Sequence, residues 1–376
     1  MSKIPKNPAG MTFNNNKIYI TAETGMHSGV GFTGAYGAIP TGGPSFGQME
    51  VAPKYGYGSH ILWDATLEAI KGGTGSLADV LTKFGTSLTK AFDRSVNRQM
   101  FGNGQGVLTL INGAGSATAT HTVDSTFYLA PGMNLLVGTK AQIEAGTADS
   151  VVVSTVNSDT SVTFTTSITS ADNDLIVTKG VYTAGTSAYE EIMGLGMLVS
   201  NNTENAGSSF QGKLRSTNAW ANSYVDSTSA VLTEAQIISM VTQATKYGDP
   251  DLIMTTPDLS NKYASLLSTN RRQVNTLDLA GGFKGLEVSI GNKPLAMVQD
   301  WDCPTGNMFC LDTATWGFAE LAPLSYLDNG MGGMLTTVVD ADGKRIPGYQ
   351  VTMKLYGNLC GTTPRANAKL TNKTAS

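Results

Sequence analysis

The longest helical pattern in the sequence constrains the fold more than any other feature. Between residues 75 and 106, apolar side chains recur at steps of three and four, the period of an α-helix with one buried stripe. Ser76 is a candidate N-cap with Asp79 three residues later, and Gly102 follows the last apolar turn. The pattern predicts a helix over 76–101, about 39 Å long at about 1.5 Å per residue.

Two properties of this helix help to decide whether it belongs to a coiled coil or forms the spine of an elongated domain. Its apolar stripe lacks a sustained a/d heptad repeat, and Gly85 interrupts the stripe. A helix of about 26 residues is also at least twice the usual globular length. We therefore expect the spine of one elongated domain, with Gly85 as a candidate bending point.

The chain carries few charges for its length. Charged residues make up 14% of the 376 residues, against about 25% in an average soluble domain, and the net charge is −4. This length exceeds the usual size of one core, so we expect two or three units. A surface so poor in charge is typical of a protein that other chains cover. No block of Lys and Arg stands out, so strong binding to phosphate groups is not expected.

The cysteine and hydropathy patterns exclude several protein classes. Cys303, Cys310 and Cys360 make an odd count without CxxC spacing, which favours a reducing compartment over a disulfide or zinc framework. No run of about 18 apolar residues exists, so we expect no membrane span. The N-terminal residues, with Pro5 and Pro8, lack the apolar region of a secretory signal.

The chain before the helix is polar and rich in glycine. Residues 1–20 indicate an extended arm that needs a partner to become ordered. The flanks of the glycine-rich stretch 21–58 are expected to pair as a long two-stranded ribbon, which must lie on something in this molecule or the next. Ser59–Ile70 is interpreted as a short amphipathic segment that leads into the helix.

Composition changes abruptly after the helix. From Val107 to Lys179 the sequence is rich in Thr, Ser, Val and Gly and has few charges. Alternating patterns between turn signals predict strands at Ser150–Val156, Ser161–Ile168 and Asp174–Thr178. We expect a small all-β domain of about five to seven strands, inserted at 108–180.

Mixed helix and strand signals return after residue 231. Thr233 and Gln236 form a capping box for a helix that Gly248 closes, and Pro257 opens a second helix that ends at about Leu267. The other predicted elements are the strands Asp251–Thr255, Leu286–Ile290, Leu295–Gln299, Asn307–Leu311, Trp316–Leu321 and Gly348–Leu359, before a polar tail that ends at Ser376.

Four glycine motifs match catalytic or cofactor-binding patterns but lack the context that the chemistry needs. GVGFTG at 29–34 matches the dinucleotide fingerprint, and GPSFG at 43–47 matches the nucleophile elbow. Both motifs require a following helix, and the residues after each cannot form one. NGQG at 103–106 and GMGG at 330–333 have no P-loop lysine, so they are interpreted as turns.

The remaining candidates do not form a catalytic or metal-binding set. His27, His60 and His121 contain no i, i+4 pair, so we interpret them as solvent-facing polar side chains. Cys303 and Cys310 are interpreted as small buried side chains. We therefore expect no catalytic residue, no cofactor-binding residue, no metal ligand and no cofactor, and we expect that the chain is not an enzyme.

Four passages, taken in order, carry a resemblance to one known family. They are VAPKYGYGSHILWDATLEAI before the helix, DRSVNRQMFGNGQGVL at its end, DPDLIMTTPDLSNKYASLLSTNRR followed by GFKGLEVSIGNKPLAMVQDWDCPTGNMFCLD, and KLYGNLCGTTPRANAKL. They resemble the extended loop, spine helix, axial domain and last peripheral strand with its tail in the major capsid protein of tailed bacteriophages, the Hong-Kong-97-type fold. The resemblance covers most of the chain outside 107–179.

The resemblance implies an α+β phage-capsid fold with five parts. They are an N-terminal arm at 1–20, an extended Gly-rich β loop at 21–58, a peripheral domain at 59–107 and 320–376 with its spine helix at 76–101, an inserted β domain at 108–180, and an axial α/β domain at 181–319.

The resemblance also implies a function, that of a major capsid protein. Its copies would assemble as hexamers and pentamers into an icosahedral shell that encloses phage double-stranded DNA, without sequence-specific binding and without a membrane. Portal and scaffolding proteins, and a decoration protein, would be its partners. The protein would assemble in the host bacterial cytoplasm and remain in the virion. The arm and the loop would reach over neighbouring subunits, and the spine helix would be repositioned as a procapsid matures.

Two details depart from the family pattern. The family often carries a long N-terminal scaffolding segment, whereas only about 20 polar residues precede the ribbon here. Some relatives cross-link a loop lysine to an asparagine of a neighbour. Lys54 and Asn358 lie in comparable parts, but no acid partner is visible, so ordinary surface residues are the better interpretation.

Three other functions stay open at this point. An encapsulin-like nanocompartment shell protein would share the fold and differ in cargo. Another phage structural protein, such as a tail or decoration protein, is disfavoured by the long helix and the α/β part because those classes are mainly β. An enzyme with a glycine-rich loop over its substrate lacks clustered catalytic side chains.

Overall fold

A computed structural model of the protein describes the whole chain except residues 1–5, 8–10, 26, 65–67, 69–76, 184–187, 270–275, 279–283, 291–292, 329–332 and 340–341. The chain forms two compact units. The first contains Met1–Phe101 and Gly194–Ser376, and the second contains Gly102–Met193.

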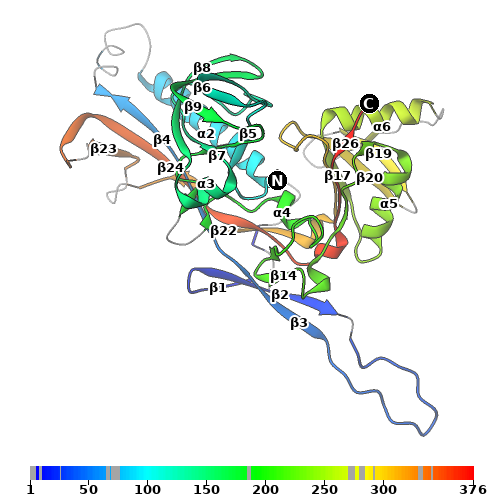
Figure 1. Ribbon diagram of the computed structural model, residues 1–376. Coiled ribbons are helices and arrows are strands. Elements are labelled where there is room, and N and C mark those ends of the chain that lie inside the picture. The colour runs from blue at the N-terminus through cyan, green and yellow to red at the C-terminus, as the bar shows by residue number, and fades with distance from the viewer. Residues whose placement is uncertain are drawn as a thin grey trace. The chain divides into compact units, whose positions relative to one another are not determined.

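A three-stranded antiparallel sheet opens the first unit. Strands β1 (Met11–Asn14), β2 (Lys17–Gly25) and β3 (Ser45–Val51) pair in this order (Figure 1). The turn between β1 and β2 contains Asn15 at φ 48° and Asn16 at φ 57°. Two consecutive left-handed residues give the turn whose twist matches a hairpin, and asparagine tolerates this conformation.

This sheet confirms one prediction and contradicts another. The flanks of the glycine-rich stretch pair as β2 and β3, as predicted. The expectation of an arm that needs a partner is wrong for residues 11–20, because β1 pairs with β2 of the same chain. Side chains alternate along β2 and bury Ile18 and Ile20, which secures the hairpin inside the unit.

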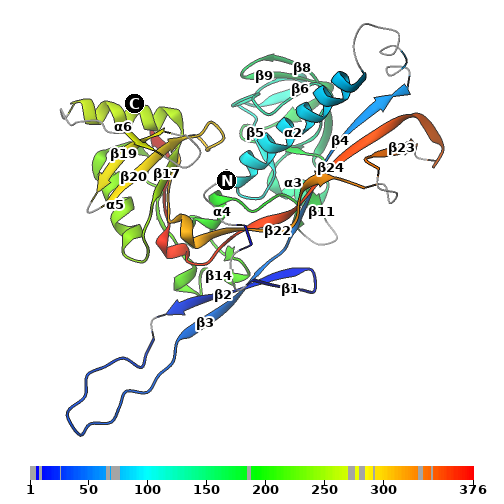
Figure 2. The same ribbon diagram turned by 180° about the vertical axis from the view of Figure 1, so that it is seen from behind.

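The long helix packs beside a four-stranded antiparallel sheet. Helix α2 (Leu77–Phe101) confirms the predicted helix, although its proposed cap Ser76 lies outside the described residues. The sheet contains β22 (Trp316–Tyr326), β24 (Arg345–Gly361) and β23 (Leu335–Val339), and β4 (Lys54–Trp63) pairs with β24 (Figure 2).

Three glycines set how closely this helix approaches the sheet. A Cβ added at Gly56 or Gly58 of β4 would lie 3.1 Å from the ring of Phe92 on α2. At Gly85, within α2, an added Cβ would lie 3.0 Å from the hydroxyl of Tyr326 on β22. The absence of side chains at these positions therefore permits close packing of helix and strand.

The start of β4 changes the interpretation of its sequence. Residues 54–58 were expected in the extended loop, and 59–63 in an amphipathic segment before the helix. All ten residues instead form one strand, in register with β24 from Lys54 opposite Gly357 to Trp63 opposite Gly348. Most of the remaining segment before α2 lies outside the described residues.

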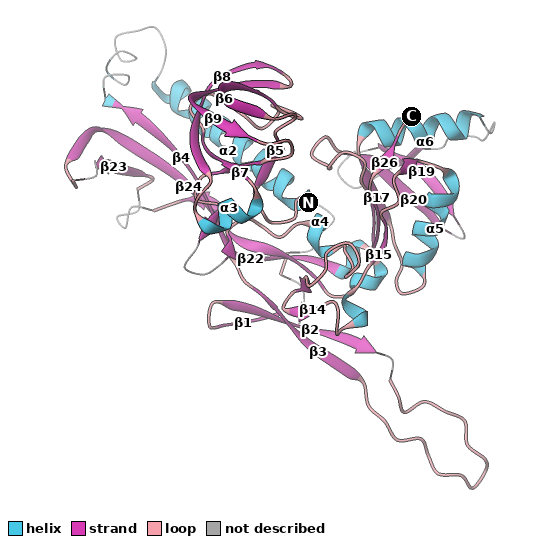
Figure 3. Ribbon diagram, in the orientation of Figure 1, coloured by secondary structure: helices cyan, strands magenta, loops and turns pink. Residues whose placement is uncertain are grey.

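A seven-stranded mixed sheet forms the other part of the first unit (Figure 3). Its strands, in spatial order, are β15 (Tyr224–Asp226), β25 (Ala368–Leu370), β21 (Met308–Leu311), β17 (Leu252–Thr255), β20 (Lys293–Gln299), β19 (Lys284–Ile290) and β18 (Thr276–Asp278). Helices α5 (Glu234–Thr245) and α6 (Pro257–Thr269) confirm the two predicted helices, and Thr233 and Gln236 form the predicted capping box.

The two helices cover the same face of this sheet. Ile253, Cys310 and Ala368 are partners on three adjacent strands, so their side chains share one face. All three belong to one buried core cluster with residues of α5 and α6. Phe309 and Lys369, each one residue away and paired across β21 and β25, therefore face the opposite side.

The end of the chain contradicts its sequence-based interpretation. Residues after 359 were expected to be a polar tail of the peripheral domain. Residues 368–370 instead form β25, inside the seven-stranded sheet between β15 and β21. Ala368 and Leu370 are fully buried in the helix-covered core. Lys369, between these two residues, concealed a short apolar alternation from the hydropathy pattern.

The second unit is a small β structure with its own core. Its six-stranded sheet has the order β5 (Val107–Leu110), β10 (Leu175–Thr178), β7 (Asn134–Gly138), β8 (Asp149–Ser158), β9 (Ser161–Ser170) and β6 (Gly115–Thr122). Strands β8, β9 and β10 coincide with the three predicted strands. Helix α3 (Lys140–Ala145), capped by Thr139, was not predicted.

The first and last strands of this sheet meet. Ile111, just after β5, forms a bridge with Val123, just after β6. The N–H of Asn112 also donates to the carbonyl of Thr122, at 2.9 Å. The sheet thus curves around a core that contains Ile111, Val123 and Phe164. Closure of this kind protects the strand edges. A smaller cluster of Ile143, Val177 and Val181 joins α3 to strand β10.

Short elements complete both units. They are β11 (Tyr182–Thr183), β12 (Ala188–Tyr189), α4 (Leu195–Leu198), β13 (Ser209–Phe210), β14 (Lys213–Leu214), η1 (Ala219–Ala221), β16 (Ala230–Val231), η2 (Thr313–Thr315), η3 (Pro364–Ala366) and β26 (Lys373–Thr374).

Candidate functional site

The loop between β2 and β3 exposes apolar side chains. Its described residues, 27–44, include no Lys, Arg, Asp or Glu. Phe32 and Tyr36 are fully exposed, and Val30 and Ile39 are 84% and 83% exposed. Burial of one such side chain stabilises a protein by about 1.5–3 kcal/mol, and the isolated chain lacks this stabilisation here. Clustered exposed apolar groups typically mark an interaction site, so this loop is the candidate functional surface.

Contacts with the rest of the chain hold the ribbon of β2 and β3 at the end away from the loop. The N–H of Glu50 on β3 donates to the carbonyl of Gln211, at 3.0 Å, and Lys17 forms a 2.6 Å ion pair with Glu50. A Cβ added at Gly47 would lie 3.6 Å from the ring of Trp220. The segment that contains Gln211 and Trp220 therefore supports β3.

Arg215 organises this supporting segment from within. Its side chain is buried, and its Nη2 donates to the carbonyls of Met197 and Leu198 at 2.8 and 3.1 Å. Its Nη1 donates to the carbonyls of Ser200 and Ala221. Burial lowers the pKa of the guanidinium to about 10, against a smaller opposing effect of the nearby Glu204 carboxylate. The group stays charged at neutral pH and joins the end of α4 to η1.

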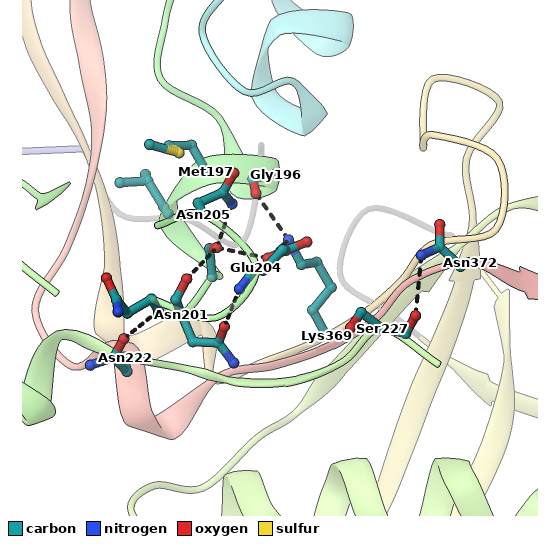
Figure 4. Close-up of polar contacts among 12 residues, drawn as sticks. Gly196, Met197, Asn201, Glu204, Asn205, Asn222, Ser227, Lys369 and Asn372 are labelled. Carbon is teal, nitrogen blue, oxygen red and sulfur yellow. Dashed lines mark hydrogen bonds and ion pairs between the residues drawn. The ribbon is translucent and has the colours of Figure 1, made fainter. Parts of the chain in front are cut away.

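A second buried cation, Lys369, lies on strand β25. Lys369 of β25 forms a 2.8 Å ion pair with Glu204 and donates to the carbonyl of Gly196 at 3.0 Å (Figure 4). Ser200 donates to the same carboxylate at 2.7 Å and accepts from Asn205, also at 2.7 Å. Burial lowers the pKa of Lys369, and the Glu204 carboxylate opposes this shift.

A third buried cation follows four residues later. Lys373 is 2% exposed and lies 3.0 Å from the carboxylate of Asp226 on β15. Burial favours a higher pKa for Asp226, but the N–H of Thr228, at 3.0 Å, and the ammonium of Lys373 outweigh it and lower that pKa. Each of the three cations is thus bonded within the chain. Arg215, Lys369 and Lys373 therefore stabilise the fold through their hydrogen bonds and ion pairs.

The predicted role of the histidines is correct for His27 and wrong for His121. His27 is exposed in the loop. His60 is half-buried on β4 and stacks on Phe84 at 4.4 Å between ring centroids. His121 is buried in the second unit, where it shares a hydrogen bond with the hydroxyl of Ser170 at 3.1 Å. The polar pattern around His121 gave no sign of burial because it lies between threonines.

The cysteines are buried, as predicted for Cys303 and Cys310, and none forms a disulfide in the described chain. Burial raises the pKa of Cys310 and of Cys360 to about 12. The thiols therefore stay protonated at neutral pH and are poor nucleophiles and metal ligands. Within the described residues, no group of three or more His, Cys, Asp or Glu side chains could hold a metal ion.

The glycine motifs have no catalytic context. Residues 29–34 lie in the exposed loop, and residues 43–47 lead into strand β3 rather than a helix. At 103–106, Gly104 and Gly106 adopt φ of 79° and 73°, which fits a turn. Most of 330–333 lies outside the described residues.

The candidate cross-link pair has a different role from that of ordinary surface residues. Asn358 is 4% exposed, and its amide donates to the carbonyl of Ala52 at 2.8 Å. Lys54 begins β4 opposite Gly357 of the same chain. Asn358 is thus a buried support of the link between β3 and β4, which makes it unsuitable for attack by a neighbour's lysine.

The described helices include none that is both long and apolar enough to cross a membrane.

A search of curated protein sequences finds no match. One solved structure, the capsid asymmetric unit of cyanophage A-1(L), is 13% identical, with a TM-score of 0.53 over 99% of this chain and 91% of that one. The capsid of an empty GTA particle is 8% identical, with a TM-score of 0.50 over 99% and 89%. These similarities show a shared fold.

A third solved structure aligns over a smaller part of the chain. The SrpI encapsulin of Synechococcus elongatus is 14% identical, but only 39% of this chain and 54% of that one align, with a TM-score of 0.29.

The family model described as SU10 major capsid protein matches residues 172–372, just over half of the chain. The chain therefore belongs to the SU10 major capsid protein family.

Proposed function

We propose that copies of this major capsid protein assemble as hexamers and pentamers into an icosahedral shell around phage double-stranded DNA. One observation supports this beyond the family itself, the uncharged apolar loop at 27–44 on a ribbon held by the rest of the chain. A contact between different surfaces of two copies would cover the loop, and such head-to-tail contacts close into rings.

In this proposal each part of the chain has a mechanical role. The loop at 27–44 reaches over a neighbouring subunit. Helix α2 and its sheet form a peripheral domain, and the seven-stranded sheet with α5 and α6 forms an axial domain at the capsomer centre. When a procapsid matures, α2 is repositioned against its sheet, and Gly85 is the point at which it bends. The second unit is an inserted domain that braces or decorates the shell.

Charge supports a container rather than a DNA-binding protein. The net charge of −4 would let the shell enclose DNA without gripping its phosphates. No reaction is part of this role, and no cofactor is required. The further partners in this proposal are portal and scaffolding proteins and a decoration protein, with assembly in the host bacterial cytoplasm.

Negative-stain electron microscopy of the purified chain, with light scattering, tests the proposal. We expect closed shells of uniform size, or capsomers that close into shells with scaffold. A discrete species no larger than a dimer, at all salt and protein concentrations, would contradict it. Shells that contain an enzyme instead of DNA in infected cells would favour the encapsulin alternative.

A further inference from the structure

An unfilled apolar cavity lies between the long helix and its sheet. It has a volume of about 180 Å³. Its lining residues include Phe84 and Leu88 of α2, His60 and Leu62 of β4, Tyr326 of β22 and Leu335 of β23. Among the described residues that line it, none carries a charge.

The size of this cavity fits one aromatic ring. An apolar cavity of about 150 Å³ in another protein stays dry and binds benzene. A cavity of this size and lining therefore gains from accepting a ring and gives little reason for water to remain. The hydroxyl of Tyr326 and the imidazole of His60 provide polar atoms for a ring that carries a hydroxyl.

The same chain exposes two rings of the required kind. Phe32 and Tyr36 lie fully exposed in the loop between β2 and β3, and the described part of that loop carries no charge. The cavity and the loop are thus complementary in size and in their lack of charge. Entry of a loop ring would remove both an empty space and an exposed aromatic side chain.

The loop cannot fill the cavity of its own chain. Ser45–Leu62, mostly the strands β3 and β4, has an extended length of about 55 Å at about 3.3 Å per residue, and Figures 1 and 2 show the two strands continuing in one direction from the loop to the end of β4. The loop doubles back on itself, so its tip reaches at most about 30 Å from its base. The ring that enters must therefore come from a second copy.

We propose that an aromatic ring of the loop, Phe32 or Tyr36, inserts into the cavity between α2 and the β4–β24 sheet of a neighbouring copy. This inference rests on the proposed function, since it requires subunits in contact. It adds the position on the neighbouring copy at which the loop binds. It also couples the loop to α2, because Phe84 and Leu88 line the cavity and Gly85 lies between them.

Cysteine pairing in assembled particles tests this contact. Because the native cysteines are buried, introduced thiols can be oxidised selectively. Particles with Phe32→Cys and Leu335→Cys should give a ladder of covalent multimers on non-reducing gels. Phe32→Cys with Ile238→Cys, a position on α5 of similar exposure (41% against 44%), should not. A second pair, Tyr36→Cys with Leu335→Cys, covers the other ring.

The outcomes separate this inference from the proposed function. Particles that form but cross-link with neither pair, or equally with the control, would overturn the inference and leave the shell function intact. A wild-type chain that never assembles would overturn both. Cross-linking within single chains would also refute the contact.

A peptide experiment applies even if the cysteine variants fail to assemble. A fluorescent peptide of residues 27–44 should bind unassembled wild-type chain, and a Phe32→Ala, Tyr36→Ala peptide should bind roughly 10- to 100-fold more weakly. Filling the cavity with Leu88→Trp should abolish binding, whereas Ile238→Trp should not. Equal binding of both peptides, or binding unaffected by Leu88→Trp, would refute the inference.

Discussion

The loop at 27–44 and the C-terminal residues 364–374 reverse the usual relation between polarity and burial. The loop leaves Phe32 and Tyr36 in water, whereas the C-terminal residues bury Lys369 and Lys373. Both arrangements follow from where partners are found. The lysines find carboxylates and carbonyls in their own chain, while the loop's rings find no cover there. Changes in the C-terminal residues should therefore affect folding, and changes in the loop should affect association.

Removal of β25 is the most severe way to test this contrast. Deleting residues 368–376 separates β15 from β21 and removes Ala368 and Leu370 from the core of the seven-stranded sheet. We expect an insoluble chain, or one without a cooperative thermal transition by circular dichroism. A truncated chain that melts like the wild type would refute the assigned role of β25.

A loop deletion provides the matched control. Gly29 and Gly42 lie side by side, so deleting residues 30–41 joins them in a tight Gly-Gly turn. We expect the free energy of unfolding to change by less than about 0.5 kcal/mol, because the removed side chains are exposed. Shell formation should be lost. A large loss of stability would mean that the loop supports its own chain.

Replacement of Arg215 should have the next largest effect. Arg215→Ala leaves four carbonyls without their donor inside the unit, and we expect a loss of about 3–5 kcal/mol in urea unfolding. Arg215→Lys should recover only part of this, since lysine lacks the planar fork. Arg365→Ala, which removes one bond to Ala219 at the edge of the same region, should cost about 1 kcal/mol. Equal losses for the two arginines would contradict this account.

A buried thiol predicts a pH dependence. Cys310 has a pKa of about 12 in the folded chain, against an ordinary value of 9.0. Below pH 9 the thiol is protonated in both states. Between these values the unfolded chain binds fewer protons than the folded chain, so stability falls as pH rises. The advantage of the wild type over Cys310→Ala should shrink by about 1.4 kcal/mol per pH unit above pH 9. A constant difference would show that Cys310 ionises in the folded chain.

Gly85→Ala should have the smallest effect on stability of the single substitutions in the first unit. Alanine favours the helix by up to about 1 kcal/mol, but its Cβ would lie 3.0 Å from the hydroxyl of Tyr326, so the net change should stay within about 1 kcal/mol. We expect shells to assemble and to expand more slowly, as followed by electron microscopy. If expansion is unaffected, the glycine serves only close packing.

The sequence predicted elements whose signals are local and missed arrangements that depend on distant partners. Helix α2 follows from its apolar period, and α5 from the capping box of Thr233 and Gln236. The seven-stranded sheet pairs Tyr224 with Ala368, and no local pattern specifies that register. Lys369 and His121 have polar identities that predict exposure, and the partners that help to make their burial tolerable include Glu204 and Ser170, which are distant in sequence.

The candidate functional surface was predicted only in outline. The glycine content of 21–58 indicated a ribbon, and its flanks pair as expected. Residues 54–58 of that range belong to β4, because Gly56 and Gly58 admit the ring of Phe92. A glycine that relieves crowding and a glycine that loosens a loop look the same in sequence, so the end of the ribbon could not be placed.

The ends of the second unit make that unit exchangeable. A Cβ added at Gly104, near its start, would lie 3.5 Å from the Cα of Met193, its last residue. Recombination that swaps one such module for another, or for a short linker, would leave the two joining points where they are. Because little loop-closure entropy separates a long insert from a short one, the length and sequence of the chain between these two points can vary without redesign of the first unit.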